Sequence, residues 1–229
     1  MQLSPRLSKI ASLIEPCHTL ADVGTDHGYI PLFCLEQGRA KKVIATDVNA
    51  MPLKRAETTI KSHGFSEFAE FRLSDGLCAI SEGEADVIVI AGMGGLLICD
   101  ILEKGKDAIT DSTLLLIQPM IAPAEVRSYL YSNGFDILNE YVVREEDKFY
   151  NIMAVKKGSC VLTDELLYIG KNLSSNSPDV IDSYLDYKIR VCEKIINGHK
   201  MSKNPDDLEI EKYSRELSIY QKTKKELML

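Results

Sequence analysis

The stretch "LADVGTDHGYIPLFCLEQG", at residues 20–38, predicts a buried strand, a tight turn and a helix in direct succession. The residues before Gly24 are mostly apolar, as in a strand that is covered on both faces. Pro31 falls in the first turn of the following helix, where proline is tolerated, and Gly38 ends that helix. Such a turn gathers backbone N–H groups and the positive end of a helix dipole, so we expect it to bind a ligand.

The same strand–helix unit repeats along residues 19–157. Five short apolar runs are typical of buried parallel strands: residues 19–23, 42–46, 69–73, 86–91 and 113–118. Four amphipathic or apolar stretches between them, each ending at a glycine, predict helices: residues 29–38, 51–64, 94–105 and 122–134. This alternation predicts an α/β fold with a largely parallel sheet.

The two ends of the chain follow other patterns. Residues 1–16 are amphipathic and predict a short helix rather than a signal peptide. Residues 136–143 and 149–156 predict a β-hairpin that closes one edge of the sheet. Apolar stripes within residues 180–196 and 208–227, joined by a loop at 197–207, predict an antiparallel helical hairpin. We therefore expect a sheet domain at residues 1–159 and a coiled-coil-like helical domain at 160–229, whose stripe can alternatively mediate self-association.

Composition narrows the class of protein. The six cysteines form no CxxC pair and lack metal-ligand spacing near histidine, so we expect no bound metal. The most apolar stretch, residues 85–98, is too short and too glycine-rich for a membrane span, which predicts a cytoplasmic protein without membrane contact. The net charge of −7 is unusual for a nucleic-acid-binding protein, so RNA binding would depend on local basic clusters. Candidate clusters lie at residues 39–42, 54–55 and 222–225.

The turn after the first strand lacks the glycine pattern that binds a dinucleotide. In G-x-G-x-x-G the second glycine lets the backbone approach a pyrophosphate, but Asp26 occupies that position here. The carboxylates of Asp22 and Asp26 would repel a pyrophosphate and would attract a cation. S-adenosylmethionine fits this requirement, because it carries an ammonium and a sulfonium group and no phosphate. An NAD-dependent enzyme is correspondingly disfavoured.

Polar residues and glycines after the later strands support the same cofactor. Asp47, followed by Val48, ends the second strand and can accept hydrogen bonds from ribose hydroxyls. Asp75 and Gly76 follow the third strand and can contact the adenine. Glycines after the fourth strand allow a close approach of the methionine end. A helix cap, a turn or close packing is the simpler alternative for each element. The predicted cofactor-binding residues are Asp22, Gly24, Asp26, His27, Asp47, Val48, Asp75, Gly76, Ala91, Gly92, Met93, Gly94 and Gln118.

Five motifs together resemble a known family. They are "RLSKIASLI" (residues 6–14), "LADVGTDHGYIP" (20–31), "VIAGMGG" (89–95), "LIQPM" (116–120) and "KFYNIMAVKKG" (148–158). The chain resembles, over essentially its whole length, the bacterial tRNA (adenine-N1)-methyltransferases that modify adenine 22 of tRNA. The resemblance implies a Rossmann-like class I methyltransferase domain, S-adenosylmethionine as methyl donor, tRNA as partner, and a C-terminal coiled-coil-like domain that helps to hold the tRNA.

The residues after the fourth strand agree with methylation of a ring nitrogen. Enzymes that methylate exocyclic amino groups often carry [DN]-P-P-[FY] there, whereas this chain has Ala-Gly-Met-Gly-Gly at residues 91–95. Adenine N1 already presents its lone pair, so the enzyme has only to unpair the base, align it and exclude water. We expect Asp26 to stabilise the cationic product, or alternatively to serve only the cofactor or the turn. We expect His27 and Tyr29 to orient the base.

Further contacts to the RNA are predicted less directly. Gln118 follows the fifth strand and can contact the base or the cofactor, and Phe149 with Tyr150 can stack on an exposed base. The tRNA phosphates would be neutralised by Arg6, Lys9, Arg39 and the basic residues of the C-terminal helices. Two other functions stay open: a methyltransferase of this fold with a different acceptor, and a non-catalytic RNA-binding module with a cofactor pocket. The sequence does not indicate which protein partners the chain has.

Overall fold

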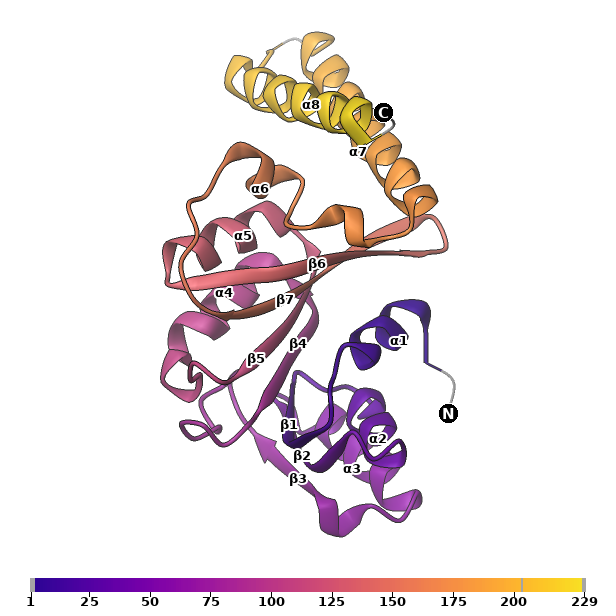
Figure 1. Ribbon diagram of the computed structural model, residues 1–229, viewed down its shortest axis with the longest axis vertical. Helices are drawn as coiled ribbons and strands as arrows, with labels where there is room; N and C mark the ends of the chain where they lie inside the picture. The colour runs from indigo at the N-terminus through magenta and orange to yellow at the C-terminus, as the bar shows by residue number, and fades with distance from the viewer. Residues whose placement is uncertain (1–2, 203, 228–229) are drawn as a thin grey trace.

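A seven-stranded sheet with helices on both faces forms the body of the protein, and a helical pair projects from one end (Figure 1). The computed structural model describes residues 3–202 and 204–227. The strand order is β3-β2-β1-β4-β5-β7-β6. The strands are β1 (Cys17–Val23), β2 (Ala40–Asp47), β3 (Ala69–Leu73), β4 (Val87–Gly94), β5 (Leu114–Ile121), β6 (Phe135–Glu145) and β7 (Lys148–Lys157).

The first five strands run parallel, and β7 is antiparallel to both β5 and β6. In register, Leu20 of β1 lies between Val43 of β2 and Val87 of β4. The chain order therefore reverses direction between β1 and β4, and ligands of open α/β sheets bind beside such a switch point. The predicted Rossmann-like α/β fold is confirmed.

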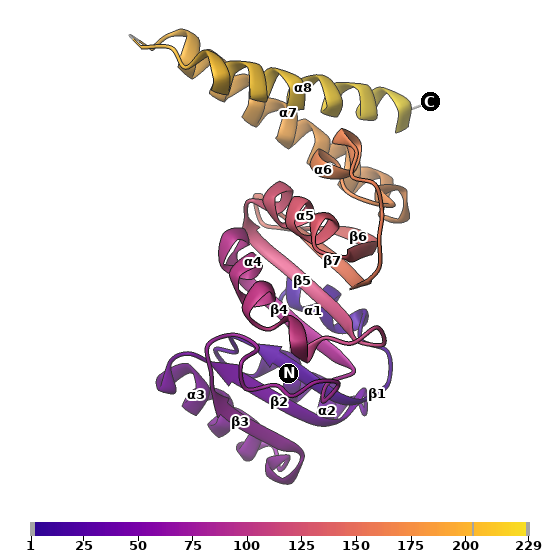
Figure 2. The ribbon, with the colours of Figure 1, turned by 90° about the vertical axis from the view of Figure 1, so that its left-hand side faces the viewer.

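Both faces of the central strands β1, β4 and β5 are covered, which explains why these strands lack alternating polarity. The prediction that residues 69–73 form a buried strand is wrong, because β3 is an edge strand of the sheet and none of its residues is buried. The helices α1 (Pro5–Ser12), α2 (Tyr29–Glu36) and α3 (Ala50–Ser62) pack on one face. The helices α4 (Gly95–Lys104) and α5 (Pro123–Ser132) pack on the other (Figure 2). Successive residues of β4 contribute to opposite cores: Val87 and Val89 to the first, Ile88 and Ile90 to the second.

The four glycines expected at helix ends do not all act in the same way. Gly38, Gly64 and Gly134 have φ angles of +64°, +84° and +77°, the left-handed conformation of a helix C-cap. Gly105 has a φ of −110° instead. A Cβ there would lie 2.2 Å from the Cβ of Leu77, so this position needs glycine for packing rather than for its backbone angle.

The C-terminal part consists of α6 (Asp164–Tyr168), α7 (Pro178–Lys200) and α8 (Asp207–Leu227). The last two form the predicted helical pair. The loop expected from residue 197 is shorter than predicted, because α7 continues to Lys200. The N–H of Met201 donates to the Asn197 carbonyl at 3.0 Å, so hydrogen bonding carries the helix through Gly198 despite the low helix propensity of glycine. Among residues 3–202 and 204–227, no helix is long and apolar enough to cross a membrane.

The helical pair shares its core with the β6–β7 hairpin. Val142 of β6 is buried together with Tyr184 and Cys192 of α7 and Tyr220 of α8, and Phe149 of β7 packs against this cluster. This shared core fixes the helical pair to the last strands of the sheet.

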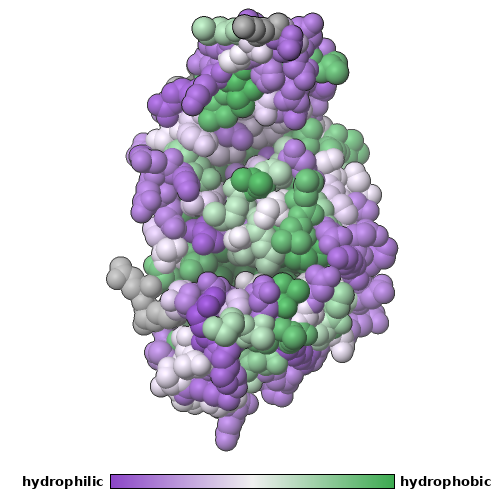
Figure 3. Space-filling model, turned by 180° about the vertical axis from the view of Figure 1, so that it is seen from behind, coloured by the Kyte–Doolittle hydropathy of each residue, from purple (hydrophilic) through white to green (hydrophobic). Residues whose placement is uncertain are grey.

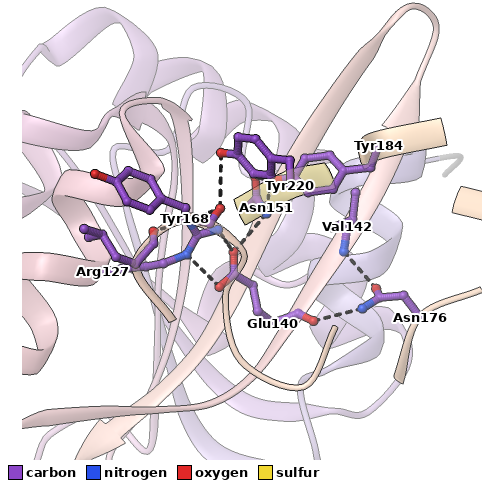
Figure 4. Close-up of polar contacts among 9 residues, drawn as sticks. Arg127, Glu140, Val142, Asn151, Tyr168, Asn176, Tyr184 and Tyr220 are labelled. Carbon is purple, nitrogen blue, oxygen red and sulfur yellow. Dashed lines mark hydrogen bonds and ion pairs between the residues drawn. The ribbon is translucent and has the colours of Figure 1, made fainter. Parts of the chain in front are cut away.

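A buried polar network lies beneath the same junction (Figure 4). Arg127 of α5 donates from Nε to the Glu140 carboxylate of β6 at 3.0 Å, and both side chains are at most 1% exposed. Asn151 of β7 donates to the same carboxylate at 2.9 Å and lies 3.4 Å from the Tyr184 hydroxyl of α7. Arg127 Nη2 contacts the same carboxylate, and Arg127 Nη1 donates to the Leu167 carbonyl of α6 at 2.8 Å. One ion pair therefore connects the sheet to the helical part.

Candidate active site

The turn after β1 is pinned to the neighbouring strand. The N–H groups of Gly24 and Thr25 donate to the carbonyl oxygen of Thr46 in β2, at 2.8 and 3.0 Å. Gly24 has a φ of +74°, and a Cβ at this position would lie 1.9 Å from the Met93 methyl carbon. The conformation and the close approach of Met93 both require glycine. At this position the backbone of the turn is therefore not covered by a side chain and is accessible to a ligand.

The turn leads directly into the N-terminus of α2. Gly28 caps the helix with a φ of +67°, and its N–H donates to the Thr25 hydroxyl at 3.2 Å. A Cβ on Gly28 would lie 3.3 Å from the Cα of Ala56 in α3, so the helix start is packed tightly against its neighbour. The positive end of the α2 dipole therefore lies at the carboxyl edge of the sheet.

Asp22, the last acid of β1, is a buried carboxyl group that is 8% exposed. Burial raises its pKa to about 6, with a hydrogen bond from Thr25 acting in the opposite direction and the nearby Asp47 carboxylate making a smaller raising contribution. A carboxylate held in this way is stabilised by a cationic ligand, because the ligand's charge offsets the desolvation of the anion.

Asp26 has a basic partner that the sequence pattern did not reveal. The Arg55 Nε of α3 donates to Asp26 Oδ1 at 3.1 Å, and a second N–H of the same guanidinium contacts that oxygen. His27 Nε2 lies 3.3 Å from the other carboxylate oxygen. The negative charge of Asp26 is thus shared between Arg55 and His27.

His27 and Tyr29 form a flat aromatic surface beside this acid. Their rings are stacked, with centroids 5.0 Å apart and planes inclined by 10°. Tyr29 is 40% exposed, and a planar ligand can extend such a stack. The two residues predicted to orient a base are therefore brought together by the first turn of α2.

The end of β2 adjoins the turn through the Thr46 carbonyl, and the end of β3 follows β2 in the sheet. The Asp47 carboxylate accepts the N–H of Asn49 at 2.7 Å, while the Asp47 carbonyl accepts the N–H of Ser74 at 2.9 Å. Val48 is 63% exposed next to Asp47. Asp75 points toward Lys104 of α4, at 3.2 Å, and both side chains are about half exposed. Contact of Asp75 with a ligand would therefore compete with this ion pair.

The fourth strand ends in a bulge that Gln118 stabilises. The pairing of β4 with β5 shifts between Ala91 and Met93, which leaves Gly92 out of the ladder with a φ of +80°. The Gly92 N–H donates to the Gln118 side-chain oxygen at 3.1 Å. Gln118 is completely buried and donates its own amide to the Pro119 carbonyl at 2.8 Å. Its polar atoms are therefore already engaged within the protein.

The same Gln118 oxygen also accepts a hydrogen bond from Arg6 Nη1 of α1 at 2.6 Å. Glu145 of β6 holds the start of this helix, because its carboxylate accepts the Ser4 hydroxyl at 2.9 Å and the Arg6 N–H at 3.0 Å. The sequence predicted that Arg6 would bind RNA phosphates and that Gln118 would contact a ligand directly. In the structure Arg6 lines the cavity and is hydrogen-bonded to the buried Gln118, and both predicted contacts stay predictions.

A cavity of about 350 Å³ lies at the carboxyl edge and is lined by Arg6, Leu7, Asp22, Gly24, Thr25, Asp26, His27, Gly28, Tyr29, Ile30, Ala91 and Gly92. The other predicted cofactor-binding residues, which are Asp47, Val48, Asp75, Gly76, Met93, Gly94 and Gln118, are not part of this lining. Figure 3 shows a face of the molecule on which apolar surface gathers around a hollow across its middle. In the described part of the chain, no group of three or more His, Cys, Asp or Glu side chains is arranged to hold a metal ion. The cavity thus combines acids, bare backbone and one arginine.

Two aromatic residues predicted to stack on a base are used elsewhere. The Phe149 ring packs against Tyr184 and Tyr187 of α7, with centroids 5.8 and 5.5 Å away. Tyr150 is 9% exposed and lies under the Arg6 guanidinium, 5.5 Å from the ring centroid. This packing contradicts the prediction, which could not anticipate that α7 and α1 cover the two faces of the hairpin.

Comparisons with known proteins extend this picture. The family model described as a methyltransferase domain matches residues 3–153. The chain is 35% identical over 158 residues to the tRNA (adenine(22)-N(1))-methyltransferase of Bacillus subtilis, a match that covers 69% of this chain and 66% of that relative.

Solved structures match over nearly the full length. A candidate tRNA (m1A22) methyltransferase from Streptococcus pneumoniae, in complex with S-adenosyl-L-methionine, is 30% identical with a TM-score of 0.84, over 96% of this chain and 99% of that one. TrmK from M. capricolum, in complex with S-adenosyl-homocysteine, is 26% identical with a TM-score of 0.83, over 98% and 99%. The similarity therefore includes the helical pair as well as the sheet.

Proposed function

Because this chain belongs to the methyltransferase-domain family, and within it to the tRNA (adenine(22)-N(1))-methyltransferases, we propose that it methylates N1 of adenine 22 in tRNA with S-adenosylmethionine as donor. The observation that carries this proposal is the cavity at the carboxyl edge, where buried Asp22, the bare turn at Gly24 and the bulge at Gly92 meet. From the tRNA substrate we infer a cytoplasmic protein.

The residues of the cavity fit the donor. Asp22 and the backbone at Gly24 bind the ammonium end, and the guanidinium of Arg6 binds the carboxylate. Asp47 accepts hydrogen bonds from the ribose, Val48 packs on the adenine, and Asp75, Gly76, Met93 and Gly94 complete the cofactor site. When bound, S-adenosylmethionine supplies an electrophilic methyl group on a sulfonium centre.

The chain's own residues then have to position a base rather than activate it. The His27–Tyr29 stack offers a flat surface for adenine, and no general base is needed because N1 carries a free lone pair once the base is unpaired. The product ring is cationic, and Asp26 is the acid next to the stacked pair. Gln118 acts through Arg6 and Gly92, as a positioning residue.

The helical pair supplies the RNA contact. Arg39 is used within the sheet domain, where its guanidinium donates to the carbonyls of Ala11 and Ile14 at 3.0 Å each. Lys9 lies over the Tyr141 ring at 4.0 Å. Arg190 and Lys194, one turn apart on α7, are exposed and have no ion-pair partner among the described residues. They are suited to bind phosphates.

One experiment tests the function. Purified protein is incubated with labelled methyl donor and unmodified tRNA, and the methylated nucleoside and its position are then mapped. We expect 1-methyladenosine at position 22. Methylation of another acceptor, or binding of S-adenosylhomocysteine and tRNA without methyl transfer, would refute the proposal in favour of one of the two alternatives. Calorimetry with S-adenosylhomocysteine and with NAD tests the cofactor separately.

A further inference from the structure

Four large apolar side chains are exposed where β4 and β5 reach the cleft. Leu96 and Leu97 lie in the first turn of α4 and are 70% and 49% exposed. Met120 and Ile121 are the last residues of β5 and are 42% and 69% exposed. We call these four residues the apolar lip. Exposed apolar side chains that gather at one place indicate an interaction surface.

The two halves of the apolar lip are held together by their backbones. Gly94 and Ile121 are paired across the parallel strands β4 and β5. A Cβ on Gly95 would lie 2.6 Å from the Ala122 carbonyl oxygen and 2.9 Å from that of Ile121. The start of α4 is therefore pressed onto the end of β5, and the lip forms one surface.

This surface is continuous with the proposed cofactor site. The Gln118 amide nitrogen lies 3.7 Å from the Met120 sulfur, and Gln118 also holds Arg6 and Gly92 in the cavity wall. Ala91 and Gly92 line the cavity, and Leu96 and Leu97 of the lip follow them within six residues of chain. A substrate that reaches the cavity from this side has to pass the lip.

The backbone next to the lip is strained. Ala122 has φ and ψ angles of 58° and 46°, in the left-handed region that non-glycine residues rarely adopt. Such a conformation costs on the order of 1–3 kcal/mol and is retained mostly at functional sites. Here it directly follows Ile121, whose side chain is 69% exposed.

Adenine N1 accepts a hydrogen bond in a Watson–Crick pair, so a paired and stacked target must leave the helix before it can be methylated. Extrusion leaves a gap in the base stack and costs a few kcal/mol. Leu, Ile and Met side chains are the ones that proteins insert between bases to stabilise such gaps. We propose that the apolar lip enters the stack that the target adenine leaves, and so lowers the free energy of extrusion. This inference rests on the proposed function.

The test uses the full chain and a tRNA with 2-aminopurine at position 22, whose fluorescence rises when the base unstacks. The variants are Leu96→Ser, Ile121→Ser and their combination. Val161→Ser is the matched control, because Val161 is 83% exposed and lies outside the lip and the cleft. Methylation is measured with unmodified tRNA and with a tRNA that is abasic opposite adenine 22, in which the target has no pairing partner.

We expect the fluorescence rise of the double variant to be at least about fivefold smaller than that of the wild type. Its kcat/KM on unmodified tRNA should be about tenfold lower. Most of this loss should disappear on the abasic tRNA, while S-adenosylhomocysteine affinity stays within about twofold. The control should match the wild type.

Unchanged kcat/KM in the double variant, or an equal loss on both tRNAs, would overturn the proposal. A wild type that sediments as a dimer and a double variant that sediments as a monomer would assign the lip to a second copy instead. Failure of the proposed function itself is distinct, because the wild type would then leave position 22 unmodified.

Discussion

The His27 ring lies flat against the Tyr29 ring, with centroids 5.0 Å apart. His27 also contacts Asp26, which is in turn bound by Arg55 of α3. An ionic contact from a neighbouring helix therefore lies next to a stacked aromatic pair beside the proposed cofactor site. The exposed pair is the surface against which we expect the target adenine to lie.

Removal of the Tyr29 ring should impair methylation of tRNA more than binding of the cofactor. Stacking of a base on an aromatic side chain contributes about 1–3 kcal/mol, so Tyr29→Ala should lower kcat/KM for tRNA by roughly 10- to 100-fold. Tyr29→Phe keeps the ring and should retain most activity. Steady-state kinetics together with S-adenosylhomocysteine calorimetry separates the two effects, and a Phe variant as impaired as the Ala variant would show that the hydroxyl matters instead.

Cofactor affinity should depend on pH through Asp22. Its pKa of about 6 means that the carboxyl group is neutral below this pH and cannot attract an ammonium group. S-adenosylhomocysteine affinity should therefore rise between pH 5 and 7, by up to about tenfold per pH unit below the pKa. In Asp22→Asn, calorimetry should show a weaker affinity that is nearly flat over the same range. A parallel slope in the variant would assign the pH dependence to another group.

The same carboxyl group should destabilise the ligand-free fold at neutral pH. Its pKa is raised from the ordinary 3.8 to about 6, so the folded state holds the proton more tightly than the unfolded state. The stabilisation is complete below about pH 4 and is lost as pH rises through 6, a difference of about 3 kcal/mol at most. Asp22→Asn should therefore raise the Tm at pH 7 without ligand. A lower Tm would contradict this sign.

Arg6 and Gln118 should act as one unit in cofactor binding. Gln118→Leu removes the acceptor of both Arg6 and the Gly92 N–H, and Arg6→Ala removes the guanidinium itself. Each change should weaken S-adenosylhomocysteine binding by roughly tenfold. Because the two residues are in contact, the double variant should be little worse than either single one, with a coupling of about 1 kcal/mol or more. Fully additive losses in calorimetry would show independent roles.

The Arg127–Glu140 pair should be essential for stability rather than for chemistry. Glu140→Gln or Arg127→Met leaves an uncompensated buried group and should cost about 3–5 kcal/mol, or a fall in Tm of at least about 6 °C. Lys61→Ala is the control, because Lys61 pairs with Glu57 on the surface and should contribute less than about 1 kcal/mol. Thermal unfolding with bound S-adenosylhomocysteine checks the prediction, and equal effects of the two pairs would contradict it.

Charge reversal on α7 should weaken tRNA binding and leave cofactor binding intact. In the double variant Arg190→Glu with Lys194→Glu, the dependence of log affinity on log salt should become shallower. The magnitude of the slope should decrease by roughly 2, one for each phosphate that the protein no longer neutralises. The control is Lys156→Glu with Lys157→Glu, the same change in charge at the end of β7, which lies beside the start of β5 and so at the opposite edge of the sheet from the cleft. Unchanged tRNA affinity across the salt series, or an equal weakening in the control, would refute this role of the helical pair.

The fold could be predicted from sequence because its signals are local. Strands buried on both faces are uniformly apolar, and the turns and helix ends are marked by glycine within a few residues. Asp22 and Asp47 could be placed at one edge for the same reason, since parallel strands end together. The predicted reason was wrong where the deciding contact is distant: Gly105 is required by its close neighbour Leu77, which lies far away in the sequence.

The interactions that the sequence could not reveal join distant segments. Arg6 and Gln118 are 112 residues apart, and Arg55 and Asp26 are 29 apart on different elements. Phe149 is apolar and aromatic, which suits base stacking and core packing equally well. Only the position of α7 decides between these uses, and no local pattern encodes it.

The β6–β7 hairpin ties both ends of the chain to its two faces: Glu145 anchors the start of α1, while Val142 and Phe149 pack with the helical pair. The helical pair is therefore not an independent module. Its removal would expose apolar surface on the hairpin and would weaken the anchor of the helix that carries Arg6. Changes in the length of the helical pair should be tolerated best at the bend between α7 and α8, which lies away from the hairpin and the cleft (Figure 1).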